Sequence, residues 1–349
     1  MVWRAILHNL PEVRGPTEKK VGFNTAIKWT LIILVLYFIL SRITVYGISG
    51  NALSNFEYLA ILLGTEFGSI ISLGIGPIVM ASIILQLLVG AKILNIDTSS
   101  TEGKRFFQAL QKILTLVFIV FEAFVYVLMG GIPAAPGFTG LVIFQLIIGG
   151  ILILFMDEVV QKWGVGSGVS LFIAAGIGVR LFSQLFQFIG PSGSFEPVGR
   201  VWGFLASIIA GDSTGAVLSL APILTTVILF LVVVFAQSLK VEVPLSYDRI
   251  RGYGVKWPLQ FFYAGVIPVI LVSALVANIQ LFSGLLENWL GYGTFLGSFV
   301  NGQPVSGVAF WIGFTPLLDA VITSSLRWEY IVQALGHILF YVVFSILFS

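Results

Sequence analysis

The sequence has 349 residues, of which 58% are hydrophobic and 10% are charged, with a formal net charge of +2 and no cysteine. Soluble domains carry about a quarter charged residues, so a surface this poor in charge matches lipid as its solvent and argues against a soluble enzyme. The absence of cysteine excludes disulfides, thiolate metal sites and thiol catalysis.

The first segment, MVWRAILHNLPEV over residues 1–13, has the pattern of a short amphipathic helix that lies on a membrane surface and stops at Pro11. A frayed terminus is the alternative. We expect residues 1–23 to form a cytoplasmic segment ahead of the first apolar span.

Eight stretches are apolar enough for helices that cross the hydrocarbon core, which needs about 20 residues per helix. They lie near Ala26–Val45, Ile70–Leu94, Ile113–Met129, Leu141–Met156, Ser167–Ile189, Leu218–Leu239, Phe261–Gln280 and Ile331–Phe348. With a cytoplasmic N-terminus, 14 of the 18 lysines and arginines fall on the cytoplasmic side. Only Arg42, Arg180, Arg200 and Arg327 fall on the other side, which supports this topology.

Two stretches do not fit a simple helical bundle. Residues 47–69 are too polar to span but contain an apolar run, so they form either a short re-entrant helix inside protein or an external loop. Gly74, Gly76 and Pro77 at the start of the second span loosen the helix there. From the sequence alone, an ordinary proline kink is the slightly favoured explanation.

A few polar side chains interrupt or flank the spans. Glu122 lies in the middle of the third span and Asn278 late in the seventh, where polar groups are rare and usually functional. A static Glu122 hydrogen-bonded to a neighbour is the alternative. Asp157 and Glu158 at a cytoplasmic helix end are expected to form a solvated turn. No GxxxxGK[ST] motif occurs, and no HExxH or GxSxG motif lies within an expected span, so we expect no catalytic residue, no cofactor and no metal.

Several segments together resemble one family, the SecY translocon subunit in its archaeal and eukaryotic-type branch. They are LPEV (10–13), VLYFIL (35–40), SLGIGPIVMASIILQLL (72–88), MDEVVQKWGVGSG (156–168), KVEVPLSYDRIRG (240–252) and IPVILVSALVANIQL (267–281). The resemblance implies an all-α membrane bundle of ten helices in two pseudo-symmetric halves. Here residues 24–190 would form the first half and residues 191–349 an incomplete second half. The last two helices of the family would be missing.

The resemblance also implies the parts of a protein-conducting channel, which passes unfolded polypeptide and releases transmembrane segments sideways into lipid. The pore ring would be Ile75, Val79, Val169, Ile173 and Ile270. The plug would be residues 51–68, with Asn51, Phe56, Tyr58, Leu62 and Gly64. The lateral gate would contain Glu122 and Asn278, a polar pair that favours closure by about 1 kcal/mol. The kink residues Gly74, Gly76 and Pro77 would lie at the start of a gate helix.

Partners follow from the same resemblance. A SecE-type gamma subunit, a Sec-beta subunit, the ribosome, signal sequences, nascent polypeptides and membrane lipid are implied, in the plasma membrane. Arg249, Arg251 and Lys256 would dock the ribosome by meeting RNA phosphates, although plain positive-inside anchoring explains the same charges. A secondary transporter built from inverted repeats and a non-conducting membrane scaffold are the competing functions.

Overall fold

The computed structural model describes residues 11–16, 21–49, 60, 63–97, 99–188, 198–245, 255–260, 266–300, 302–315, 317–322, 324 and 327–348. Seven helices in these ranges are long and apolar enough to cross a membrane. Six of them are α2 (Phe23–Arg42), α5 (Thr101–Leu128), α6 (Thr139–Trp163), α7 (Gly168–Phe186), α9 (Ser213–Ser238) and α13 (Trp328–Phe348), and the seventh is Pro268–Leu290 of α10 (Val266–Leu290). The all-α membrane bundle that the resemblance implies is confirmed.

Shorter elements connect these helices. They are the helices α4 (Gly76–Gly90), α8 (Arg200–Ala210), α11 (Gly307–Trp311) and α12 (Leu317–Ile322), and the strands β1 (Lys240–Leu245), β2 (Val255–Gln260), β3 (Ser298–Val300) and β4 (Gln303–Ser306). Each strand pair forms an antiparallel two-stranded sheet. β1 and β2 follow α9, so the connection between the expected spans six and seven is a hairpin that the apolar pattern did not indicate.

The second expected span differs most from the sequence prediction. Residues 70–94 do not form one spanning helix, because α4 begins only at Gly76 and has 15 residues. Gly74 has φ +53, a left-handed conformation that favours glycine, and a Cβ there would lie 2.4 Å from the carbonyl oxygen of Leu63. Pro77 therefore lies in the first turn, where its missing N–H needs no partner, and not at a kink inside a helix.

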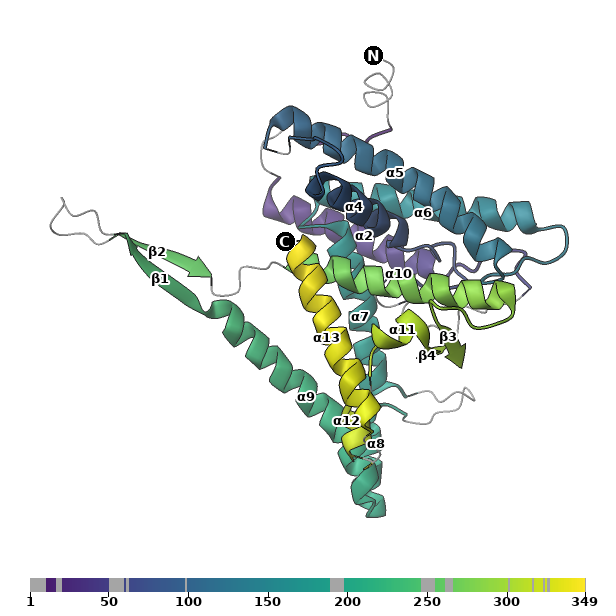
Figure 1. Cartoon of the computed structure of the whole chain (residues 1–349), viewed down its shortest axis with the longest axis vertical. Coiled ribbons are helices and arrows are strands. Elements are labelled where there is room, and N and C mark those ends of the chain that lie inside the picture. Colours follow the sequence, from purple (N-terminus) through teal and green to yellow (C-terminus); the bar gives the residue numbers. More distant parts are fainter. Residues whose placement is uncertain are drawn as a thin grey trace.

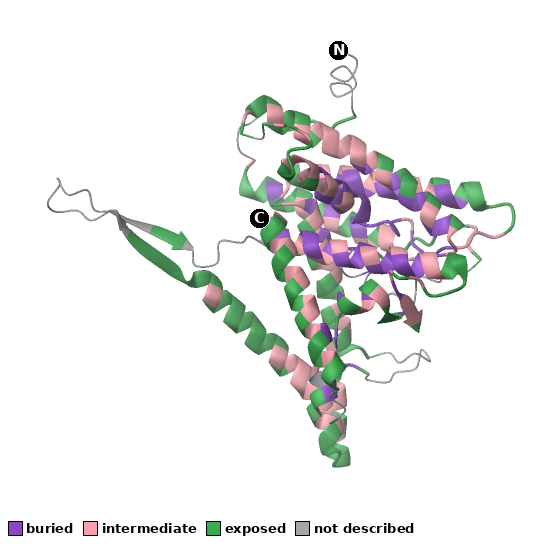
Figure 2. Cartoon of the chain, in the orientation of Figure 1, coloured by how far each residue is buried: buried purple, intermediate pink, exposed green. Residues whose placement is uncertain are grey.

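The hydrophobic core lies among α2, α4, α5, α6, α7 and α10 (Figure 1). The purple ribbon in Figure 2 gathers on these helices, and fully buried members include Ile71, Leu73 and Ile119. In contrast, α9 has no buried residue and leads away from the core to the β1–β2 hairpin. Because α9 is apolar along its length, its exposed surface is suited to lipid.

The base of the segment that precedes α4 is held by backbone pairing. The N–H of Val45 donates to Gly68 O at 2.9 Å, and the N–H of Ile70 donates to Ile43 O at 2.9 Å. A further bridge joins Ile48 to Ala134, beyond the end of α5. The residues that follow α2 and the residues that lead into α4 are therefore held next to each other.

Candidate functional site

An aliphatic cluster joins α4 and α7. Ile75, the residue before α4, and Val79, one turn into it, are 0% and 2% exposed. Val169 and Ile173 on α7 are partly buried and pack against the same core cluster. All four residues therefore belong to or pack against one core cluster, and their arrangement as a ring stays a prediction.

Leu63 and Gly64, at the C-terminal end of the expected plug range, lie between these two helices. The N–H of Ile75 donates to Leu63 O at 2.9 Å. A Cβ on Gly64 would lie 3.4 Å from the backbone of Phe172 and 3.5 Å from the N of Ile173. Leu63 and Phe172 are both fully buried, and sequence reasoning did not single out either one. The other expected plug residues, Asn51, Phe56, Tyr58 and Leu62, lie outside the described residues.

The fifth ring candidate, Ile270, is half-buried on α10. The buried α10 residues of the core cluster are Leu271, Ala274, Ala277, Leu281 and Leu285. The membership of Ile270 in the ring stays a prediction.

Glu122 of α5 and Asn278 of α10 converge on Gly76 at the start of α4. A Cβ on Gly76 would lie 3.1 Å from Glu122 Oε2 and 3.8 Å from Asn278 Oδ1, so it would crowd the Glu122 carboxyl and make ordinary contact with Asn278. Glu122 and Asn278 are 0% and 1% exposed. Three helices therefore meet at one buried polar point in an apolar surrounding.

The polar groups at this point are not paired with one another. Within the part of the chain that the structure describes, both carboxyl oxygens of Glu122 and Asn278 Oδ1 have no hydrogen-bond partner. Asn278 Nδ2 donates to Ala274 O in its own helix at 2.9 Å. Among the described residues, neither the expected closing hydrogen bond across the seam nor a static partner for Glu122 is found, since the amide donor of Asn278 is directed to its own helix.

Other contacts hold α5 against α10 along this seam. The rings of Phe121 and Phe282 are 6.3 Å apart between centroids. Near its C-terminus, α10 contributes Asn288, whose Nδ2 lies 3.2 Å from both Met129 O and Gly130 O beyond the end of α5. Sequence reasoning missed Asn288, although its polar side chain near the end of an apolar helix was a usable signal.

Asp157 corrects another expectation. Its side chain is not in a solvated turn but 4% exposed on α6. It accepts hydrogen bonds from Gln161 Nε2 at 2.7 Å and from the N–H of Val169 at 3.0 Å. Its neighbour Glu158 forms ion pairs with Lys112 at 2.9 Å and Lys162 at 3.1 Å.

Residues 11–14 lie along the same end of α5 and α6. Lys112 Nζ donates to Pro11 O at 2.6 Å, Lys162 pairs with Glu12, and Trp163 Nε1 donates to Arg14 O at 2.8 Å. The hydrogen bond from Lys162 holds the pKa of the Glu12 carboxyl below its ordinary value. The rest of the expected amphipathic segment, residues 1–10, lies outside the described residues.

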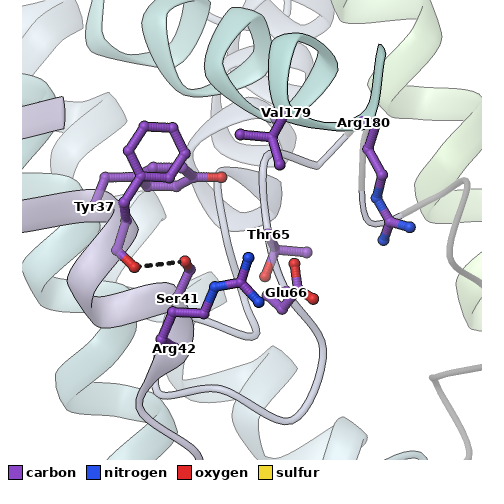
Figure 3. A pocket seen from close by; sticks show the side chains of 9 residues that line it. Tyr37, Ser41, Arg42, Thr65, Glu66, Val179 and Arg180 are labelled. Atoms are coloured by element: carbon purple, nitrogen blue, oxygen red, sulfur yellow. Dashed lines mark hydrogen bonds between the residues drawn. The ribbon is translucent and has the colours of Figure 1, made fainter. Parts of the chain in front are cut away.

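A small open pocket lies where α2, residues 65–66 and α7 meet (Figure 3). Its lining includes Arg42 at the end of α2, Arg180 of α7 and Glu66. Arg42 and Arg180 are two of the four basic residues that the topology assigned to the non-cytoplasmic side. Their shared pocket places both side chains on one side of the membrane, as the topology expects, and which side that is stays a prediction.

The remaining expected sites are not brought together. Arg249 and Arg251 lie outside the described residues, and the backbone of Lys256 pairs with Pro244 in the β1–β2 hairpin. In the described ranges, no group of three or more His, Cys, Asp or Glu side chains could hold a metal ion.

Comparisons with known proteins agree with this geometry. The SecY family profile matches residues 69–349. A protein translocase subunit SecY of Methanothermobacter thermautotrophicus is 48% identical over 91% of this chain and 70% of its own length. A solved structure titled as that of a protein conducting channel is 36% identical with a TM-score of 0.79, over 98% of this chain and 75% of that chain. Sec61 from a canine ribosome-channel complex of the endoplasmic reticulum is 36% identical with a TM-score of 0.78, with the same coverage.

Proposed function

Because this chain belongs to the SecY family, it is the pore-forming subunit of a protein-conducting channel, and we propose here how its own residues seal and open that channel. The family is a translocation channel in the membrane and not an enzyme. Family membership replaces the transporter and scaffold functions that the sequence alone left open.

The seal is the aliphatic cluster of α4 and α7 with residues 63–64 between them. A dry aliphatic constriction raises the free energy of a hydrated ion, and flexible side chains let a polypeptide pass without binding it. The observation that carries this proposal is that Leu63 O accepts the N–H of Ile75, while a Cβ on the adjoining Gly64 would lie 3.5 Å from the N of Ile173. Residues 51–68 then act as the plug, since displacement of Leu63 and Gly64 exposes the ring.

The lateral gate is the seam between α4 and α5 on one side and α10 and α13 on the other. α10 packs against α4 and α13. Apolar contact and the Asn288 bonds hold the seam shut, whereas the unpaired acceptors of Glu122 and Asn278 make closure less favourable. An apolar segment in transit can open this seam and leave through it into lipid.

Partners and orientation follow the family. A SecE-type gamma subunit, a Sec-beta subunit and signal sequences join the channel, in the plasma membrane with the N-terminus in the cytoplasm. The Sec61 relative comes from a complex with a ribosome, and the corresponding surface here is the β1–β2 hairpin, with Lys256 on β2 and the adjoining Arg249 and Arg251. The lysine and arginine asymmetry of the sequence supports this orientation.

A crosslinking experiment tests the seal. A photocrosslinker is placed at Ile75, Val79 or Ile173, and a secretory polypeptide is stalled on ribosomes with membranes that contain the channel. Adducts should form at these positions along the whole stalled chain. Ile209 of α8, which is 87% exposed, is the control position and should give lipid adducts only. If Ile209 and the ring positions crosslink the polypeptide equally, these residues do not line the pore.

A further inference from the structure

The N-terminus of α7 is capped from a different helix. Helix N-termini leave backbone N–H groups without partners, and the residue before the helix usually supplies a side-chain acceptor. Ser167 occupies that place before α7 with extended backbone, but its side chain makes no capping bond. The acceptor is Asp157 of α6 instead, which takes the N–H of Val169 at 3.0 Å and also that of Gly168.

The carboxylate suits this role in charge as well as in geometry. The N-terminus of a helix carries partial positive charge and favours an anion beside it. Asp157 is 4% exposed, and its second oxygen is occupied by Gln161 Nε2 at 2.7 Å. Both oxygens are thus fixed, so the side chain has a single favourable position at the α6–α7 junction.

The junction is also closely packed on its other sides. A Cβ on Gly168 would lie 2.5 Å from the Cα of Asp157, so the first turn of α7 lies directly against α6. The N–H of Val165 donates to Thr30 Oγ1 of α2 at 3.0 Å. The turn that starts α7 is therefore tied to two neighbouring helices.

We propose that Asp157 is the positioning residue for the α7 side of the pore seal. Val169, whose N–H Asp157 holds, is one ring residue, and Ile173 lies one helical turn further along. Loss of the cap frees the first turn of α7 and shifts both aliphatic side chains away from Ile75 and Val79. This inference rests on the proposed function of the ring.

Ion leak through the closed channel in membrane vesicles tests the proposal. Asp157→Ala should raise halide influx about fivefold, the population change that corresponds to the roughly 1 kcal/mol typical of a lost N-cap. Adding Ser167→Asp to Asp157→Ala supplies an acceptor at the ordinary capping position, and should return the leak to within about twofold of wild type. A channel that Asp157→Ala does not make leaky, or whose leak Ser167→Asp does not reduce, overturns the proposal.

Two further variants keep the outcome decisive. If Asp157→Ala does not accumulate, Asp157→Asn replaces it, and a smaller leak that Ser167→Asp suppresses supports the proposal, whereas no leak overturns it.

The chain has no cysteine, so with an added thiol oxidant Val169→Cys is the one position in this chain that can form a disulfide with a cysteine in a stalled polypeptide. A disulfide together with an unchanged leak in the Asp157 variants refutes the positioning role only. No disulfide, with the leak and its rescue observed, refutes the ring assignment of Val169 but supports the positioning of α7.

Discussion

Asp157 on α6 and Glu122 on α5 are both buried, at 4% and 0% exposed, but their surroundings are opposite. Asp157 accepts bonds from a side chain and from the backbone at the start of α7, whereas both oxygens of Glu122 have no partner among the described residues. A buried acceptor without a partner is unfavourable, and one that is fully bonded fixes its neighbours. The α6–α7 junction at Asp157 is therefore held in one arrangement, whereas the seam at Glu122 opens with a small free-energy change.

Breaking the fixed junction should give the largest effect. Gly168→Ala places a Cβ 2.5 Å from the Cα of Asp157, and backbone cannot yield as a flexible side chain can. Such overpacking should lower the free energy of unfolding by about 2 to 3 kcal/mol, measured as thermal unfolding of the purified protein. Gly178→Ala on the same helix is the matched control, because a Cβ there has nothing within 4 Å. Equal effects of the two substitutions would show that the junction is not tightly packed.

A substitution in the seam should stabilise the closed channel, in contrast to the destabilisation expected at the junction. Glu122→Leu removes two unpaired acceptors from an apolar site, and should make the closed channel about 1 to 2 kcal/mol more stable. The consequence is slower lateral release of weakly apolar segments, measured as their partition into lipid during insertion. Glu122→Gln, which keeps a polar group at the same place, is the control and should change release less. Faster release by the leucine variant would show that Glu122 favours closure after all.

The sequence predicts the membrane spans well because the lipid environment requires a long apolar helix at each of them. Ser213–Ser238 has no buried residue, yet it is recognised as a helix, since lipid demands an apolar surface and internal backbone pairing. The α4 region is harder, because its helix starts late for a tertiary reason, the approach of Leu63 O to Gly74. The short helices α11 and α12 and the two hairpins carry no periodic pattern long enough to detect.

For the candidate sites too, the sequence indicated some residues, whereas their contacts depend on tertiary packing. Glu122 and Asn278 were identifiable as polar groups in apolar spans, but their meeting point at Gly76 depends on how three helices pack. Asp157 was misassigned because a charge near a helix end is usually solvated. Its partners on α7 lie on the far side of a turn, and no local pattern shows that this turn folds back onto the carboxylate.

A smaller effect is expected at the end of the seam. Asn288→Ala removes the two hydrogen bonds to Met129 O and Gly130 O, each 3.2 Å long. The loss should favour the open seam by about 1 kcal/mol, measured as more efficient release of the same weakly apolar segments. Tyr292→Ala, at an exposed side chain just beyond α10, serves as the control. Unchanged release in the Asn288 variant would place the gate contacts elsewhere along α10.

The smallest effect should come from the attachment of residues 11–14 to α6. Because the hydrogen bond from Lys162 lowers the pKa of Glu12, the attached state favours the ionised carboxylate. Its contribution is complete above the ordinary carboxyl pKa and is lost as the pH falls through the lowered value, since protonation removes the ion pair. Limited proteolysis near Pro11 should therefore quicken slightly in acid, and Glu12→Gln should show the faster rate at every pH. The change is small because Glu12 is 66% exposed and water screens the pair. Lys104→Gln, which removes a charge from an exposed side chain on α5, should leave the pH dependence intact. A pH dependence that survives in Glu12→Gln would assign the titration to another group.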